Sequence, residues 1–147
     1  MTAKPIVVSP ADYAARLDVV GEHVTVLASK DLTGGYELFL QEGPEGSGPP
    51  PHSHGWDESF FVMQGTVEFG YDDERLSAGP GTLVHLPAGT THWFRFAPGG
   101  GRMLSISGNG SNAARMFTEM DAEIPPGAPD IPKVVAVARR HGLTIGE

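Results

Sequence analysis

Residues 51–58 read Pro51-His52-Ser53-His54-Gly55-Trp56-Asp57-Glu58, so two histidines and a glutamate follow the end of a proline run. Side chains alternate between the two faces of a strand, so His52 and His54 are expected to point the same way, with Ser53 opposed. Two imidazoles at this spacing can bind one ion, and the Glu58 carboxylate follows after a short gap. The segment therefore predicts three ligands of a metal site.

A fourth ligand is predicted at His92, which follows Pro87-Ala88-Gly89 and begins another predicted strand. The chain has no cysteine, so any metal must take nitrogen and oxygen ligands. Three imidazoles and one carboxylate suit one divalent transition metal ion, namely Fe, Mn, Ni, Cu, Co or Zn, whereas Ca and Mg prefer oxygen ligands. The alternative is that these are ordinary surface or core histidines, and for an isolated His-x-His pair the two interpretations carry similar weight.

Around this segment the chain reads as an all-β protein. Short runs of β-branched, aromatic and aliphatic residues have the length of strands and are separated by turn residues. They lie at 23–27, 36–41, 58–63, 66–71, 75–77, 82–86, 91–96 and 102–107. This spacing is typical of a sandwich or a closed barrel. We expect a single domain over residues 1–147, with the barrel core at about 22–108 and a Pro-rich, helical tail at 112–147.

Short helices are predicted near the two ends of the sequence. Ser9 can cap a helix over 10–17 with Pro10 in its first turn, and Gly142 can end a helix over 133–141. Between the barrel and the second helix, Met116, Phe117 and Met120 are expected either to cover an end of the barrel or to form a dimer contact.

The charge and the hydropathy pattern exclude several classes of partner. The formal net charge of −8 disfavours nucleic acid, because phosphate contacts need clustered basic residues. No segment approaches the roughly 18 consecutive apolar residues of a membrane span, and the first residues lack a signal-peptide pattern. We therefore expect a cytoplasmic protein with neither a nucleic-acid nor a membrane partner, which the absence of cysteine is consistent with.

Two longer patterns of spacing strengthen the metal-site interpretation. The first consists of Gly46, His52, His54, Glu58 and Gly65, and the second of Gly81, Pro87, Gly89 and His92. Both resemble the signature motifs of the cupin superfamily, and the chain is similar to small single-domain cupins of the quercetin-dioxygenase-like kind. The second motif lacks its usual final Asn, because Phe96 stands there. The resemblance implies a jelly-roll barrel in which His52, His54, Glu58 and His92 bind the metal.

Four apolar residues are predicted to share the faces of the ligands, namely Phe60, Val62, Phe94 and Phe96. One interpretation is that they are barrel core; the other is that one or two of them line an apolar substrate pocket, and both can hold at once. Phe96 in place of Asn implies a more apolar pocket wall. His85 lies two residues before Pro87 and is expected at the surface or in an interface rather than in the pocket.

The resemblance leaves the activity open, because one fold serves many reactions. The first hypothesis is a mononuclear metal-dependent dioxygenase acting on a small, aromatic or polyketide-like substrate, with Glu58 able to act as a base. The alternatives are a non-redox cyclase or isomerase, in which the metal is a Lewis acid, and a binding module without turnover. Cupins commonly pair, so a homodimer is expected, with residues 4–9 as a strand that could be exchanged.

Overall fold

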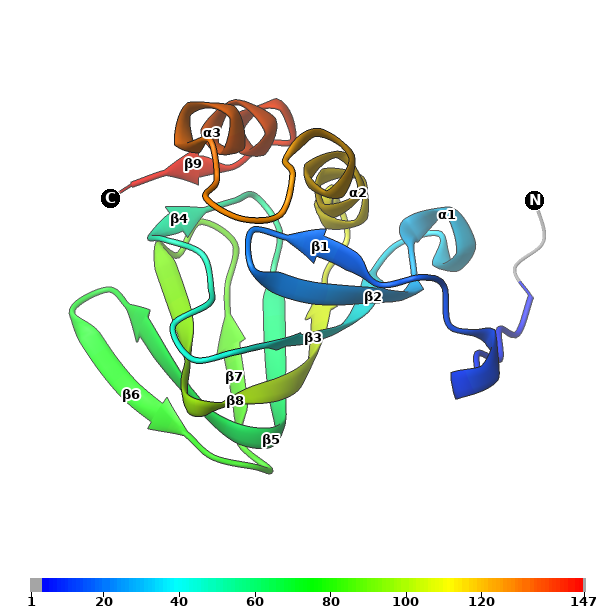
Figure 1. Cartoon of the computed structure of the whole chain (residues 1–147). Helices are drawn as coiled ribbons and strands as arrows, with labels where there is room; N and C mark the ends of the chain where they lie inside the picture. Colours follow the sequence, from blue (N-terminus) through cyan, green and yellow to red (C-terminus); the bar gives the residue numbers. More distant parts are fainter. Residues whose placement is uncertain (1–3, 147) are drawn as a thin grey trace.

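A curled antiparallel β-sheet forms the body of the protein in the computed structural model, which describes residues 4–146 (Figure 1). Its strands are β1 (Leu17–Val19), β2 (Glu22–Ala28), β3 (Glu37–Gly43), β4 (His52–Ser53), β5 (Glu58–Tyr71), β6 (Glu74–Ala78), β7 (Leu83–Leu86), β8 (His92–Ser107) and β9 (Thr144–Ile145). One path through the sheet runs β1-β2-β3-β8-β4-β9, and β5 pairs with β6, β7 and β8. The predicted all-β barrel is confirmed.

Two long strands, β5 and β8, join segments that the sequence predicts as separate strands. The separate runs at 58–63 and 66–71 predict a turn at Gln64-Gly65, and this is wrong: β5 continues through it, with register shifts between Val62 and Gln64 and between Gly65 and Val67. Gly65 has a φ of +74°, and a Cβ there would lie 2.2 Å from the carbonyl oxygen of Gly100. A glycine bulge therefore bends the strand without ending it.

The inside of the barrel is filled by apolar side chains from β5 and β8 and from the shorter strands β6 and β7. We call this group the barrel cluster, and its buried members are Phe60, Val62, Val67, Phe69, Ala78, Val84, Leu86, Phe94, Phe96 and Met103. Phenylalanine rings from β5 and β8 contact one another, with centroids 5.3 Å apart for Phe60 and Phe94. Removing this apolar surface from water is the main favourable contribution to folding here.

Helices cover one end of the barrel, above β4 in Figure 1. They are α2 (Ala113–Glu123) and α3 (Ile131–Arg140), with a short α1 (Lys30–Thr33) and a 3-10 turn at Pro10–Asp12 elsewhere. Apolar side chains spaced three or four residues apart in α2 are buried. Among them, Phe117 packs edge-to-face on Phe39 of β3, with ring centroids 5.1 Å apart. Met116, Phe117 and Met120 thus cover a barrel end, which is one of the two predicted roles.

The tail returns to the sheet after α3. Asp130 caps α3 by accepting a hydrogen bond from the backbone N–H of Lys133 (3.2 Å), so the helix begins slightly before the predicted 133–141. The short strand β9 then pairs with β4, where Ile145 lies opposite His52. The pair of covering helices is therefore connected to the sheet on both sides in the chain, because β8 precedes α2 and β9 follows α3.

The N-terminal segment differs from the prediction. Only Pro10–Asp12 is helical within the predicted 10–17, because the chain then extends and pairs as β1 with β2. Residues 4–9 lie in no helix or strand. Among the described residues, no helix is both long enough and apolar enough to cross a membrane.

Candidate metal centre and ligand cavity

Three histidines meet at the covered end of the barrel. His52 lies on β4 and His54 just after it, while His92 begins β8 directly opposite His52 in the sheet register. One ring nitrogen from each lies within 4.8 Å of the others, and all three side chains are buried. Residues forty positions apart in the sequence therefore form one group that could hold a metal ion, as the spacing predicts.

The orientation of each ring is fixed by a hydrogen bond at Nδ1. The acceptors are backbone carbonyl oxygens: Pro50 for His52 (2.9 Å), Trp56 for His54 (3.0 Å) and Thr90 for His92 (2.8 Å). An Nδ1 that donates to a carbonyl leaves Nε2 with a free lone pair. This is the arrangement in which proteins present histidine to a metal, with the backbone selecting the tautomer.

The Glu58 carboxylate lies among these lone pairs. Its Oε1 is 3.1 Å from Nε2 of His54 and 3.3 Å from Nε2 of His92. A carboxylate oxygen only accepts hydrogen bonds, so each of these contacts needs a proton on Nε2, and a metal ion would take the place of that proton. The three histidines form a group that could hold a metal ion, and the Glu58 carboxylate lies beside two of them. Nitrogen and oxygen donors of this kind suit a divalent transition metal ion.

The pKa shifts describe the same balance of charge. Burial opposes the charged form of Glu58, but hydrogen bonds from His54 and His92 outweigh it and lower the pKa of Glu58 to about 2. Burial and the nearby His92 lower the pKa of His52 to about 4. Burial also opposes charge on His92, yet its hydrogen bond to Glu58 raises its pKa. At neutral pH the group thus offers an anionic carboxylate and a neutral His52, the forms that bind metals.

A cavity of about 340 Å³ opens onto this group between the barrel and the covering helices. His52, His54 and Glu58 form part of its lining, whereas His92 is not among the lining residues and is 2% exposed. The apolar lining comes mainly from the two helices and from the segments beside β9; it includes Met116, Phe117, Met120, Val134, Ala138, Leu143 and Ile145. A largely apolar cavity with a few converging polar groups is the usual form of a small-molecule site.

The four predicted pocket residues occupy different places. Phe94 lines the cavity, while Phe60, Val62 and Phe96 belong to the barrel cluster beneath it. His85 is exposed, and its Nδ1 lies 2.8 Å from the hydroxyl of Ser59, away from the cavity.

Sequence reasoning did not identify three polar residues of the cavity wall. Trp56 is buried, stacks on His54 with centroids 4.2 Å apart, and its Nε1 has no hydrogen-bond partner among the described residues. Glu22 on β2 and Gln41 on β3 are also buried and line the same cavity. Trp56 lies inside the first motif and could have been noticed, but no local pattern distinguishes Glu22 or Gln41 from solvent-facing strand residues.

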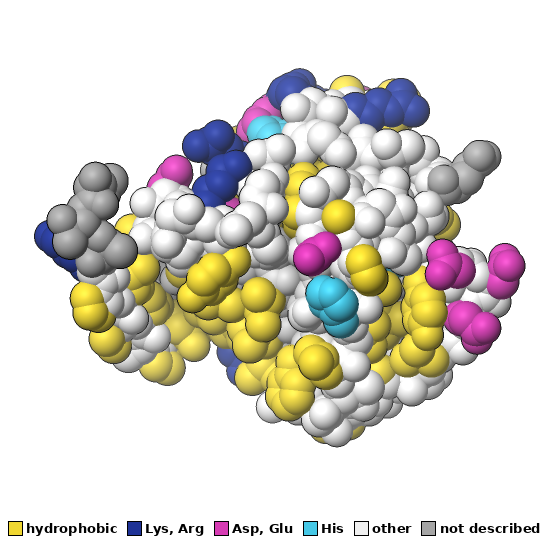
Figure 2. All heavy atoms as spheres, turned by 180° about the vertical axis from the view of Figure 1, so that it is seen from behind, with side chains coloured by type: hydrophobic (Ala, Val, Ile, Leu, Met, Phe, Trp, Pro, Cys, Tyr) yellow, Lys and Arg dark blue, Asp and Glu magenta, His cyan; other side chains and the backbone are white. Residues whose placement is uncertain are grey.

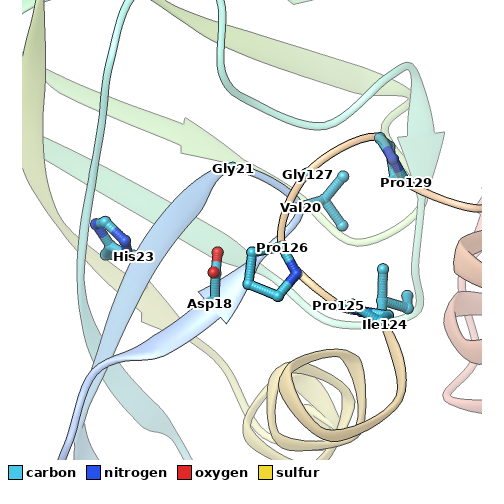
Figure 3. A pocket seen from close by; sticks show the side chains of 9 residues that line it. All are labelled: Asp18, Val20, Gly21, His23, Ile124, Pro125, Pro126, Gly127 and Pro129. Carbon is cyan, nitrogen blue, oxygen red and sulfur yellow. The ribbon is translucent and has the colours of Figure 1, made fainter.

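A second cavity of about 200 Å³ lies between the β1–β2 turn and the segment 124–129 (Figure 3). Asp18 and His23 form its polar side, and prolines of the 124–129 segment form the other (Figure 3). None of the predicted ligands lines it. Val20 borders both cavities, so the β1–β2 turn separates this surface cavity from the larger one.

Comparison with known proteins agrees with this geometry. A family model described as a cupin domain matches residues 39–107. Quercetin 2,3-dioxygenase from Bacillus subtilis (strain 168) is 31% identical over 74 residues, which are 50% of this chain and 22% of that protein. The chain therefore spans about a fifth of the length of this curated relative.

Solved structures share the fold at low sequence identity. The structure of KdgF from Halomonas sp. has a TM-score of 0.62 and 19% identity, covering 69% of this chain and 91% of that one. The polyketide cyclase RemF from Streptomyces resistomycificus has a TM-score of 0.62 and 21% identity, covering 71% of this chain and 80% of that one. The domain match, the fold shared with these structures and the two motifs that meet at the histidine group show that residues 39–107 of this chain form a cupin domain.

Proposed function

We propose that this protein is a mononuclear metal-dependent enzyme that acts on a small, largely apolar organic substrate, and that its reaction is a dioxygenation. The observation that carries this proposal is the cavity of about 340 Å³ whose lining includes His52, His54 and Glu58. We call His52, His54, His92 and Glu58 the metal-binding group. A ligand in this cavity would have apolar contacts on most sides and would reach the metal-binding group at one end. Cavities of roughly 300–1,000 Å³ are typical of small-molecule sites.

The residues have separate tasks in this proposal. Nε2 of His52, His54 and His92, together with the Glu58 carboxylate, would hold the ion. A bound transition metal ion supplies Lewis acidity toward a substrate oxygen and, if it is redox-active, a route for electrons to O₂. Glu58 would accept a proton from a substrate hydroxyl at Oε1, leaving an enolate or phenolate. The side chains of α2 and α3 would exclude water from that end of the substrate.

Two lines of comparison bear on the type of reaction. The alignment with the Bacillus subtilis quercetin 2,3-dioxygenase, 31% identical over 74 residues, supports a dioxygenation. The polyketide cyclase RemF, in contrast, is a structural neighbour named for a cyclisation. Because the donor set suits Zn as well as Fe, Mn, Co, Ni or Cu, a cyclisation or isomerisation with the metal as Lewis acid is the second candidate.

Oxygen uptake tests the proposal. Metal-free protein is reloaded separately with Fe, Mn, Co, Ni, Cu and Zn, and then mixed with quercetin and related flavonols in an oxygen electrode. We expect uptake with at least one redox-active metal, none with Zn, and a large loss in Glu58→Gln. Absence of uptake with every metal would overturn the dioxygenase proposal for these substrates. Product formed under anaerobic conditions would favour the cyclase or isomerase instead.

We also propose that the protein is a homodimer. Exposed hydrophobic side chains occupy several places on the face seen in Figure 2. On neighbouring strands, Phe61 of β5 and Leu83 of β7 are paired in register and are 41% and 60% exposed, with Met63 close by at 39%. Contiguous exposed apolar residues favour burial against a partner. Sedimentation velocity should give twice the chain mass, and Phe61→Glu should shift it toward the monomer.

A further inference from the structure

Glu22 and Gln41 form a polar pair in the cavity wall that the metal-binding group does not use. They come from adjacent strands, β2 and β3, and are 5% and 4% exposed. Gln41 donates a hydrogen bond from Nε2 to Oε1 of Glu22, at 3.3 Å. Among the described residues this is the one side-chain hydrogen bond of Glu22, which leaves its second carboxyl oxygen without a partner there. Both residues of the pair line the cavity.

A purely structural role does not account for this pair. Glu37 shows what a buried structural carboxylate looks like in this fold: its oxygens accept hydrogen bonds from Ser111 Oγ (2.7 Å), Ala114 N (3.1 Å) and Lys30 N (3.0 Å). These bonds tie β3 to the start of α2 and to α1. Glu22, in contrast, has a single long bond and joins no distant elements. A buried polar group with so few partners is costly unless something else binds it.

The protonation state of Glu22 adds to this geometry. Burial raises the pKa of Glu22 to about 8, against the hydrogen bond from Gln41 and with a further contribution from the negative Glu58. At neutral pH the carboxyl group is thus mainly neutral and carries a hydroxyl that can donate. Together with the amide of Gln41, the pair offers both donors and acceptors toward the cavity.

We propose that Glu22 and Gln41 bind a hydroxyl or carbonyl group of the substrate and so determine its specificity. This inference rests on the proposed function, because it takes the cavity as the substrate site. The substrate class becomes narrower: an apolar, ring-sized molecule with two separated oxygen functions, one for the metal-binding group and one for the pair. A substrate that lacks the second oxygen would leave Glu22 with the bond from Gln41 alone, and sites that bind a substrate hydroxyl discriminate strongly against analogues without it.

The test compares two probes that differ in one group. Both are naphthols, and at the opposite end of the ring system they carry either a second hydroxyl or a methyl group of similar size. Binding is measured by calorimetry to Zn-loaded protein, which holds the site in a redox-inert form, so the readout does not depend on turnover. The variants are Glu22→Leu, which removes the hydrogen bonds, and Glu22→Gln, which keeps them. Glu42→Leu is the matched control, on β3 beside Gln41 but outside the cavity lining.

Wild type should favour the dihydroxy probe relative to Glu22→Leu by roughly tenfold, the value of one well-made hydrogen bond. Glu22→Gln should retain most of this preference, and Glu42→Leu all of it. If Glu22→Leu does not fold, Gln41→Leu should show the same loss. An unchanged ratio in these variants, or no binding of either probe, overturns the inference. Failure of this inference can be distinguished from failure of the proposed function. Selectivity for the second hydroxyl without oxygen uptake would contradict only the dioxygenase proposal. Oxygen uptake without that selectivity would contradict only the role of Glu22 and Gln41.

Discussion

His52 and His92 lie opposite each other on β4 and β8, and the two motifs with their resemblance to cupins predicted that both belong to one site. Each belongs to a short motif whose proline and glycine residues fix the local chain direction, so a local pattern carries the information. Glu22 and Gln41 are different, because an alternating polar residue in a strand looks the same whether its face meets solvent or a cavity. Which of the two it meets depends on α2 and α3, which lie far away in the sequence.

His52→Ala should greatly reduce metal binding. The variant removes one of three imidazole nitrogen donors, and even changes next to metal ligands commonly weaken binding by about 10- to 100-fold. Metal content of anaerobically purified protein, measured by mass spectrometry, is the readout. His85→Ala is the matched control, since His85 is an exposed histidine on β7 that contacts Ser59. Equal metal content in wild type and His52→Ala would contradict the assigned site.

At the scale of elements, the sequence predicted the strand segments better than their connections. Gln64-Gly65 looks like a turn because glycine favours one, but the β8 backbone beside Gly65 keeps the chain in the sheet as a bulge. Similarly, within α2 the sequence predicted only that Met116, Phe117 and Met120 would be buried, without giving the bounds of a helix. Its helical form is supported by contacts with Glu37 and Phe39, which no window of local sequence contains.

The helix α3 offers a way to close the cavity without touching the metal-binding group. Val134 lies on the cavity side of α3, so Val134→Trp should fill part of the 340 Å³ space. We expect naphthol binding to weaken by at least about tenfold while metal content stays at the wild-type level, because larger side chains displace ligand volume. Ala136→Trp is the control on the exposed side of the same helix. Unchanged naphthol binding in Val134→Trp would mean that the ligand does not occupy this cavity.

The whole molecule contains two separate groups of buried apolar residues, one inside the barrel and one beneath α2 and α3. The barrel cluster lies between the strands, whereas several residues of the group beneath α2 and α3 line the cavity. This explains why Phe60, Val62 and Phe96 lie below the site and Phe94 borders it. Alternation along a strand predicts that all four point inward, but it does not predict how deep the cavity extends.

Folding around a buried Glu22 should make stability depend on pH in a definite direction. The pKa of Glu22 is about 8 in the folded protein and 4.5 as its ordinary value. Between these values the folded chain keeps a proton that the unfolded chain has released, so the free energy of unfolding falls as pH rises. The slope from this one group is on the order of 1 kcal/mol per pH unit from about pH 5 to about pH 8.

Glu22→Gln isolates this contribution, because the amide does not titrate while the shape of the side chain is kept. Other groups, including His52 and His92, titrate in both proteins and largely cancel in the difference. In urea unfolding of metal-free protein, Glu22→Gln should therefore gain stability relative to wild type as pH is raised through this window. Parallel curves would show that Glu22 is already ionised in the folded state, and the pair with Gln41 would then present an anion to the cavity.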